Sequence, residues 1–190
     1  VFNIDDINLK KIKRTNKLLA VGRLTKQKNF SFLIKCFEQL EKKYPDTYIL
    51  NILGEGEKKE DLQNLINQLN LQDKVNLLGY KKNTNHFYQE SFCFILSSLW
   101  EDPGFVMIEA AINETFILSS NCPNGPKEFV EDDKAGILFE SNNIESFVEN
   151  FDKMIQLKDE DKDKIINYSK KKAYLYSSEE HFKKINLILK

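Results

Sequence analysis

The sequence predicts an α/β fold in which a parallel six-stranded sheet carries helices on both faces. Short apolar segments alternate with longer amphipathic segments along the chain. The short segments are apolar nearly throughout, which is typical of strands that are buried on both faces. Strands that alternate with helices form parallel sheets, because each helical connection returns the chain to the same end of the sheet.

Six strands are expected in chain order. The first three are apolar runs that end at Gly22, Gly54 and Gly79, and the fourth ends at two serines. The predicted strands cover residues 18–21, 48–53, 75–78, 92–96, 116–120 and 136–139.

Helices are expected between these strands. The first shows the helical period clearly, because Phe30, Leu33, Ile34 and Phe37 recur at spacings of three and four. The predicted helices cover residues 30–44, 58–69 and 86–90, begin near residues 104 and 126, and run from residue 143 to the end.

The composition excludes several classes of function. The 28 basic and 29 acidic residues leave a net charge of −1, so no overall field would recruit nucleic acid or an anionic membrane. The longest apolar run, residues 92–100, is too short to span a bilayer, and the first residues lack the pattern of a signal peptide.

Cys36, Cys93 and Cys122 lack the intervals of metal ligands, so we expect three reduced thiols in a cytosolic protein and no metal site.

The chain divides into a short lead and one domain. Residues 1–16 are polar and show no core pattern, so we expect an interdomain linker there. Residues 17–190 are long enough to bury a sizeable core and are expected to form a single domain.

Polar residues and glycines gather where the strands are expected to end. Each of the first four predicted strands is closely followed by such residues: Arg23, Gly54-Glu55-Gly56, Gly79 and Glu101. Since ligands bind at the carboxyl ends of parallel strands, these residues can line one crevice although they are far apart in the sequence. Arg23 is also one of only two arginines, and a guanidinium binds phosphate through two parallel hydrogen bonds.

Two glutamates flank the start of the helix that begins near Gly104. Glu101 precedes the helix and Glu109 lies one to two turns inside it. A helix start attracts anions through its free N–H groups and its dipole, so a ligand with phosphate between two hydroxyl-rich rings would fit here. A nucleotide sugar has that shape. Acidic residues near a helix start are also ordinary capping chemistry, and the rest of the chain decides between the two interpretations.

Six short motifs follow one another between residues 18 and 139. They are Val21-Gly22-Arg23-Leu24 with Lys28; Leu53-Gly54-Glu55-Gly56; Val75-Asn76-Leu77-Leu78-Gly79; Ser98-Leu99-Trp100-Glu101; Gly104-Phe105 with Glu109; and Gly125-Pro126-Lys127-Glu128 before Gly136-Ile137-Leu138. In this order they resemble the C-terminal, donor-binding half of a retaining GT-B glycosyltransferase of group 1, also called family 4. The resemblance implies that the sheet is Rossmann-like.

The resemblance implies a role for each matching charged residue. Arg23 and Lys28 resemble the pair that binds the donor diphosphate and stabilises charge on the leaving nucleotide. Glu101 resembles the glutamate that contacts the transferred sugar. Glu109 resembles the glutamate that accepts hydrogen bonds from the ribose hydroxyls.

The resemblance also implies a set of donor-binding backbone groups. N–H groups at Gly104, Phe105 and Val106 would contact the phosphates, and the loop at Tyr80 and Lys81 would hold the base. The remaining members of the implied donor-binding set are Gly22, Gly54, Gly79 and Ser98.

The sequence departs from the family pattern at two places. Asp102 and Pro103 stand where glycine and an aromatic residue are more common, which bears on the loop shape and the sugar specificity. Residues 113–116 lack the usual glycine and proline before the fifth strand, and we interpret this difference as structural.

The implied activity is transfer of a sugar from a UDP-, GDP- or ADP-sugar to an acceptor hydroxyl, with retention and without a metal or other cofactor. The setting would be bacterial polysaccharide or glycolipid synthesis in the cytoplasm. The family's acceptor domain precedes this half, so the chain is expected to be an incomplete fragment that cannot catalyse transfer alone. The expected partners are the nucleotide sugar and, through the other half, a glycan or lipid-linked acceptor, with contact at the inner face of the membrane left open and no nucleic acid.

Two other functions fit the same residues. One is a sugar-nucleotide epimerase of the same fold, which would change the sugar at C2 without an acceptor. The other is a nucleotide-binding module without chemistry of its own, for which loss of Glu109 is the informative substitution.

Overall fold

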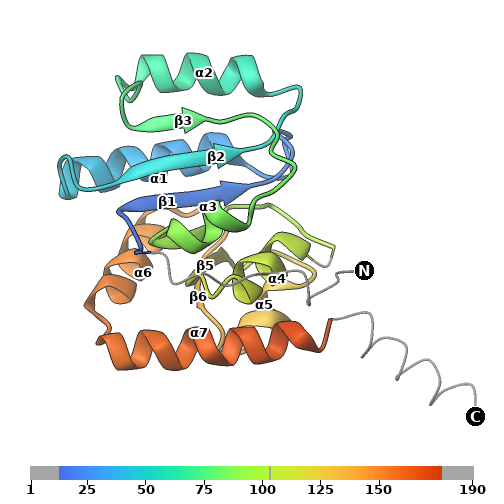
Figure 1. Ribbon diagram of the computed structural model, residues 1–190. Helices are drawn as coiled ribbons and strands as arrows, with labels where there is room; N and C mark the ends of the chain where they lie inside the picture. Colours follow the sequence, from blue (N-terminus) through green and yellow to red (C-terminus); the bar gives the residue numbers. More distant parts are fainter. Residues whose placement is uncertain (1–12, 103, 177–190) are drawn as a thin grey trace, which may run out of the picture.

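The computed structural model describes residues 13–102 and 104–176 (Figure 1). Within them lies one six-stranded sheet in which all strands are parallel, in the order β3-β2-β1-β4-β5-β6. The strands are β1 (Lys17–Val21), β2 (Ile49–Leu53), β3 (Val75–Leu77), β4 (Cys93–Leu96), β5 (Ile117–Ser120) and β6 (Ile137–Phe139). The predicted Rossmann-like parallel sheet is confirmed, and every strand lies within one residue of its expected bounds.

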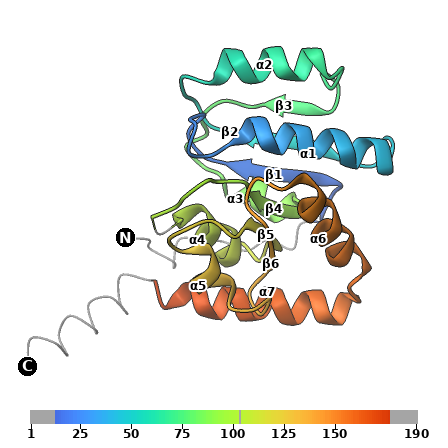
Figure 2. The same cartoon turned by 180° about the vertical axis from the view of Figure 1, so that it is seen from behind.

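Helices cover both faces of this sheet, as predicted. α3 and α4 lie in front of the sheet in Figure 1, whereas α1 and α6 lie in front of it in Figure 2. The helices are α1 (Phe30–Lys43), α2 (Lys59–Gln68), α3 (Asn85–Glu90), α4 (Phe105–Ile112), α5 (Pro126–Val130), α6 (Ile144–Gln156) and α7 (Asp159–Tyr174). The helical stretch predicted from residue 143 is two helices, which are separated by extended backbone at Leu157 and Lys158. Residues 177–190 lie outside the described part of the chain.

Each face of the sheet has its own apolar core. On one face, α1 and α6 bury aromatic rings, and the ring centroids of Phe147 and Phe151 lie 6.2 Å apart. On the other face, α4 is apolar on nearly all sides because it lies between the sheet and α7. Small residues there, Ala110 and Ala173, are fully buried, which lets the two helices approach closely.

The strand order creates a switch point between β1 and β4. The chain leaves β1 towards one face of the sheet and leaves β4 towards the other, since α1 and α4 belong to different cores. The loops that follow these two central strands therefore diverge. In open α/β sheets this divergence leaves a crevice at the carboxyl ends of the strands, where ligands bind.

Glycines allow the loops after β1, β2 and β3 to touch through their backbones. The N–H of Gly22 donates to the Leu53 carbonyl, and the N–H of Gly54 donates to the Gly79 carbonyl, both at 2.9 Å. A Cβ atom on Gly54 would overlap the carbonyl oxygen of Gly22, so no other residue fits there without moving the β1 loop. The close approach explains the glycine after β2, whereas Gly79 has a φ of 70°, in the left-handed region that favours glycine.

The unusual segment before β5 is a helix cap that does without glycine. Glu114 has a φ of 58°, in the left-handed region where glycine is usual. Its N–H donates to the Ala111 carbonyl at 3.0 Å, and the N–H of Thr115 donates to Ala110 at 2.9 Å, the pair of bonds that defines a Schellman cap. The Glu114 carboxylate also pairs with Lys170 of α7 at 2.6 Å. At this departure from the family pattern, Glu114 thus adopts the left-handed cap conformation and makes an ion pair to a neighbouring helix.

The described residues include the last part of the predicted linker and all three cysteines. Residues 1–12 of the predicted linker lie outside the described residues, and Thr15 is bound to the Glu90 carbonyl through its N–H at 2.8 Å. Cys36, Cys93 and Cys122 are buried and unpaired. Over residues 13–102 and 104–176, none of the helices combines the length and the apolar character that a bilayer crossing requires.

The contact between Gly22 and Gly54 leads to a stability prediction. Gly54→Ala places a methyl group on the Gly22 carbonyl, and we expect the free energy of unfolding to fall by more than about 2 kcal/mol. Asn64→Ala, on the exposed side of α2, is the control and should change it by less than about 0.5 kcal/mol. Urea unfolding monitored by circular dichroism measures both, and equal stability of the two variants would contradict the proposed close contact.

Candidate functional site

A cavity of about 510 Å³ opens at the carboxyl ends of the strands. Its walls come from the loops after β1, β2 and β3 and from the first turns of α4. Seven of the predicted site residues line it: Gly22, Arg23, Gly54, Tyr80, Lys81, Val106 and Glu109. Of the post-strand residues expected in one crevice, Arg23, Gly54 and Glu55 line this cavity, whereas Gly56, Gly79 and Glu101 do not.

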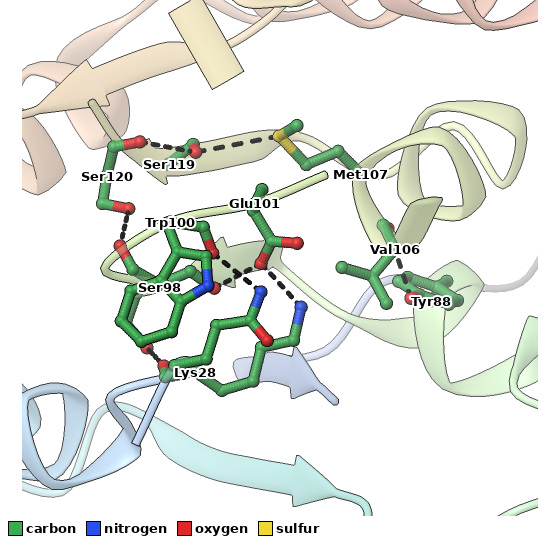
Figure 3. Close-up of polar contacts among 11 residues, drawn as sticks. Lys28, Tyr88, Ser98, Trp100, Glu101, Val106, Met107, Ser119 and Ser120 are labelled. Carbon is green, nitrogen blue, oxygen red and sulfur yellow. Dashed lines mark hydrogen bonds and ion pairs between the residues drawn. The ribbon is translucent and has the colours of Figure 1, made fainter. Parts of the chain in front are cut away.

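A buried ion pair lies across the switch point beside this cavity. The Nζ atom of Lys28 is 2.6 Å from Oε1 of Glu101, and the two side chains are only 13% and 4% exposed. The hydroxyl of Ser98 donates to the same carboxylate oxygen (Figure 3). The hydroxyl of Ser120 in turn donates to the Ser98 carbonyl at 2.7 Å. Glu101 is thus fixed by a cation and a hydroxyl from two different loops.

Backbone contacts fix the loop that carries Lys28. The hydroxyl of Ser97 donates to the Lys28 carbonyl at 2.8 Å, and the N–H of Leu99 donates to the Gln27 carbonyl at the same distance. The aliphatic part of Lys28 lies against Gly22, where a Cβ atom would come within 2.9 Å of the Lys28 Cε atom. Gly22 therefore leaves the space through which Lys28 reaches Glu101.

Glu109 projects from the second turn of α4 into the cavity and is held by a neutral donor. The hydroxyl of Tyr88 donates to Oε2 of Glu109 at 3.0 Å. Burial raises the pKa of the Glu109 carboxyl, while the Tyr88 hydrogen bond and the nearby Lys28 ammonium counteract that rise.

The start of α4 joins these two parts of the site. Gly104 has a φ of 83°, and a Cβ atom on it would come within 2.9 Å of the Met107 methyl group. Gly104 is buried close to Glu101, while Phe105 begins the helix with 46% of its surface exposed. The first N–H groups of a helix have no acceptor within the helix, and Val106 of this first turn lines the cavity.

The last two predicted residues complete the arrangement. Gly79 does not line the cavity, but its carbonyl holds Gly54 in the cavity wall. Ser98 is fully buried and acts on Glu101 instead of facing the cavity. Within the described residues, no three histidine, cysteine or acidic side chains lie close enough together to hold a metal ion.

A family model described as "Glycosyl transferases group 1" matches residues 2–172. The chain belongs to the group 1 glycosyltransferases. The family resemblance inferred from the six motifs is therefore confirmed, together with the fold that it implied.

Similar proteins include named glycosyltransferases of this group. An uncharacterized glycosyltransferase of Methanocaldococcus jannaschii is 46% identical over 112 residues, which are 59% of this chain and 27% of that protein. The N-acetylgalactosamine-N,N'-diacetylbacillosaminyl-diphospho-undecaprenol 4-alpha-N-acetylgalactosaminyltransferase of Campylobacter jejuni is 33% identical over 153 residues, 80% of this chain and 40% of that protein. The chain thus spans less than half the length of these relatives.

Solved structures share the architecture. A mutant of Staphylococcus aureus TarM, crystallised with fondaparinux, alpha-GlcNAc-glycerol and UDP, superposes with a TM-score of 0.85 at 26% identity, over 95% of this chain and 37% of that one. The C-terminal domain of a group 1 glycosyl transferase from Francisella tularensis superposes with a TM-score of 0.72 at 18% identity, over 87% of this chain and 89% of that one. The second likeness concerns the fold alone.

Several residues of this site were not predicted from the sequence. Lys82 and Thr84 also line the cavity, as does Glu55, which was expected in the crevice, and Gln27 ties the β1 loop to Trp100 through a 2.9 Å hydrogen bond to its carbonyl. Lys82 directly adjoins the predicted Lys81, which is the signal that could have found it. Tyr88 carried no such signal, because a tyrosine on a short helix is indistinguishable from a core residue in the sequence.

The Lys28–Glu101 pair leads to a second stability prediction. Lys28→Met leaves the Glu101 carboxylate buried without its cation, and we expect the free energy of unfolding to fall by about 3 kcal/mol. Adding Glu101→Gln removes the stranded charge and should recover part of that loss, which a urea double-mutant cycle measures.

The control is Lys42→Met, which removes an exposed helical ion pair with Glu38 and should cost less than about 0.5 kcal/mol. If Lys28→Met destabilises the protein no more than the control does, the pair does not hold the switch point together.

Proposed function

We propose that this chain is the donor-binding part of a retaining glycosyltransferase that takes a sugar from a nucleoside diphosphate to an acceptor hydroxyl. The observation that carries the proposal is the convergence of Arg23 and Glu109 in one cavity, beside the buried Lys28–Glu101 pair. A cation, a carboxylate and a helix start at one crevice, with a second carboxylate in the buried pair beside it, match the chemistry of a phosphate between two hydroxyl-rich rings.

The positive groups would bind the diphosphate. Arg23 is exposed at the cavity wall, where its planar guanidinium can form two parallel hydrogen bonds to phosphate oxygens. Lys28 gives one contact to Glu101 and has further N–H donors, because an ammonium group carries three. The start of α4 adds backbone donors near Gly104, Phe105 and Val106.

These groups would also lower the barrier to transfer. The bond between the anomeric carbon and the diphosphate oxygen breaks, and the leaving diphosphate gains negative charge that Arg23 and Lys28 stabilise. The acceptor oxygen forms its bond to the anomeric carbon on the same face, and its proton passes to the leaving phosphate oxygen. Positive charge from two side chains serves this step, so we propose that the reaction uses no metal or other cofactor.

The two carboxylates would orient the donor. Glu101 is fixed by Lys28 and Ser98 and would accept hydrogen bonds from hydroxyls of the transferred sugar. Glu109 would accept them from the ribose, and the loop at Tyr80 and Lys81 would hold the base. The presence of UDP in the TarM crystal and in a complex of pneumococcal GtfA supports a uridine donor among UDP-, GDP- and ADP-sugars.

The acceptor would be a glycan or a lipid-linked sugar, bound by a further domain outside this chain, with residues 1–16 as the linker to it. The names of relatives support this setting, since they include enzymes of lipopolysaccharide core and poly(ribitol-phosphate) glycosylation. On this proposal the protein works in the cytoplasm in bacterial polysaccharide or glycolipid synthesis, with peripheral contact at the inner face of the membrane through the acceptor-binding part.

Nucleotide binding tests the donor site directly. Calorimetry with UDP, GDP and ADP should show binding of at least one of them to the 190-residue chain. Glu109→Ala should weaken that binding by about tenfold or more, because hydrogen bonds to a charged group contribute about 1.5–3 kcal/mol each.

The matched control is Glu149→Ala, an exposed glutamate on α6, which should leave the affinity unchanged. Failure to bind all three nucleotides would overturn the proposed donor site. If the complete protein instead changed a nucleotide sugar at C2 without an acceptor, the epimerase alternative would replace sugar transfer.

A further inference from the structure

Tyr88 lies on the short helix α3, directly behind the wall of the cavity. Its side chain is fully buried, and its ring packs at 5.6 Å from that of Phe94 in the central strand β4. The hydroxyl of Thr115 donates to the Tyr88 carbonyl at 2.8 Å, and the N–H of Tyr88 donates to the Thr84 carbonyl at 3.2 Å. Both its backbone and its ring are therefore fixed.

The Tyr88 hydroxyl points towards α4 and ends on Glu109. The hydroxyl oxygen lies 3.0 Å from Oε2 of Glu109 and 3.3 Å from the Val106 carbonyl oxygen. Figure 3 shows the second of these contacts, between Tyr88 and Val106. A phenol has a single proton to donate, and the charged acceptor at the shorter distance is the stronger partner. Burial and the neighbouring Glu109 carboxylate raise the pKa of Tyr88, so the hydroxyl remains a donor at neutral pH.

Packing alone does not explain this hydroxyl. A phenylalanine would fill the same apolar space, whereas a buried hydroxyl costs free energy unless it has a partner. The partner is the Glu109 carboxylate, which itself lines the cavity. The hydrogen bond therefore connects a ring of the core to a side chain of the cavity wall. The tyrosine therefore acts on Glu109 as well as on the core.

We propose that Tyr88 is a positioning residue for nucleotide recognition, which holds Glu109 in the orientation that binds the ribose hydroxyls of a nucleoside diphosphate. This inference rests on the proposed donor site. Tyr88 occupies one side of Oε2 and leaves Oε1, together with the open side of Oε2, for the two vicinal hydroxyls of a ribose. A deoxyribose offers one hydroxyl fewer, so a fixed carboxylate distinguishes the two sugars.

Several cations surround Glu109, so the orientation of its carboxylate depends on a group that holds it. Lys28 attracts the carboxylate from the β1 loop, and Arg23, Lys81 and Lys82 line the same cavity. A glutamate that could rotate freely would turn towards one of these cations. The hydrogen bond from Tyr88 opposes that rotation without adding a charge next to the phosphate site.

The test measures selectivity for ribose. Whichever of UDP, GDP and ADP binds the 190-residue chain is compared by calorimetry with its 2′-deoxy form, in the native protein and in Tyr88→Phe. We expect the native protein to prefer the ribonucleotide by about tenfold and Tyr88→Phe to lose most of that preference, since one hydrogen bond to a charged group is at stake. Glu109→Gln combined with Tyr88→Phe should lower the preference no further than Glu109→Gln does alone.

The matched control is Tyr44→Phe, which removes a 2.7 Å hydrogen bond from a phenol to Asp152, a carboxylate of α6 that does not line the cavity. It should leave the preference intact. An unchanged preference in Tyr88→Phe, or no preference in a native protein that binds the nucleotide, would overturn the role of Tyr88. Absence of binding to all three nucleotides would instead overturn the donor site itself, so the two failures are distinguishable.

Discussion

The buried ion pair between Lys28 and Glu101 is the interaction on which the site depends. It joins the loops that follow β1 and β4, the two strands whose connections leave the sheet in opposite directions. A buried pair gains little net stability, because desolvation of both charges offsets most of their attraction. Its value here is geometric: Ser98 and the backbone of the β1 loop complete the contacts, so both charges have defined positions before any ligand arrives.

Two glutamates of the same helix region are held in different ways. Glu101 has a cation and a hydroxyl on one oxygen, whereas Glu109 has a neutral phenol and only a more distant attraction to Lys28. The first carboxylate is nearly inaccessible, and the second lies half-buried in the cavity wall with a raised pKa. On the proposed function, this division suits one carboxylate next to the reacting sugar and one that selects the nucleotide.

The loops achieve this arrangement with few conformationally special residues. Gly22 and Gly54 allow backbones to touch, and Gly22 also leaves room for the stem of Lys28. The end of α4 needs the same left-handed geometry but uses Glu114, whose ion pair with Lys170 ties α4 to α7. Glycine thus occupies two positions where a Cβ atom would collide, Gly22 and Gly54, whereas Glu114 takes a left-handed backbone angle and still carries a side chain.

The sequence by itself determined the order of the elements and the end of the sheet at which the site lies. Apolar runs and helical periods depend on local composition, and the carboxyl ends of parallel strands meet at one edge whatever the details, so Arg23, Glu101 and Glu109 could be assigned to one crevice. Only the tertiary structure decided which side chains touch. The Lys28–Glu101 pair spans 73 residues, and Tyr88 meets Glu109 because α3 and α4 pack together, a relation that no local pattern encodes.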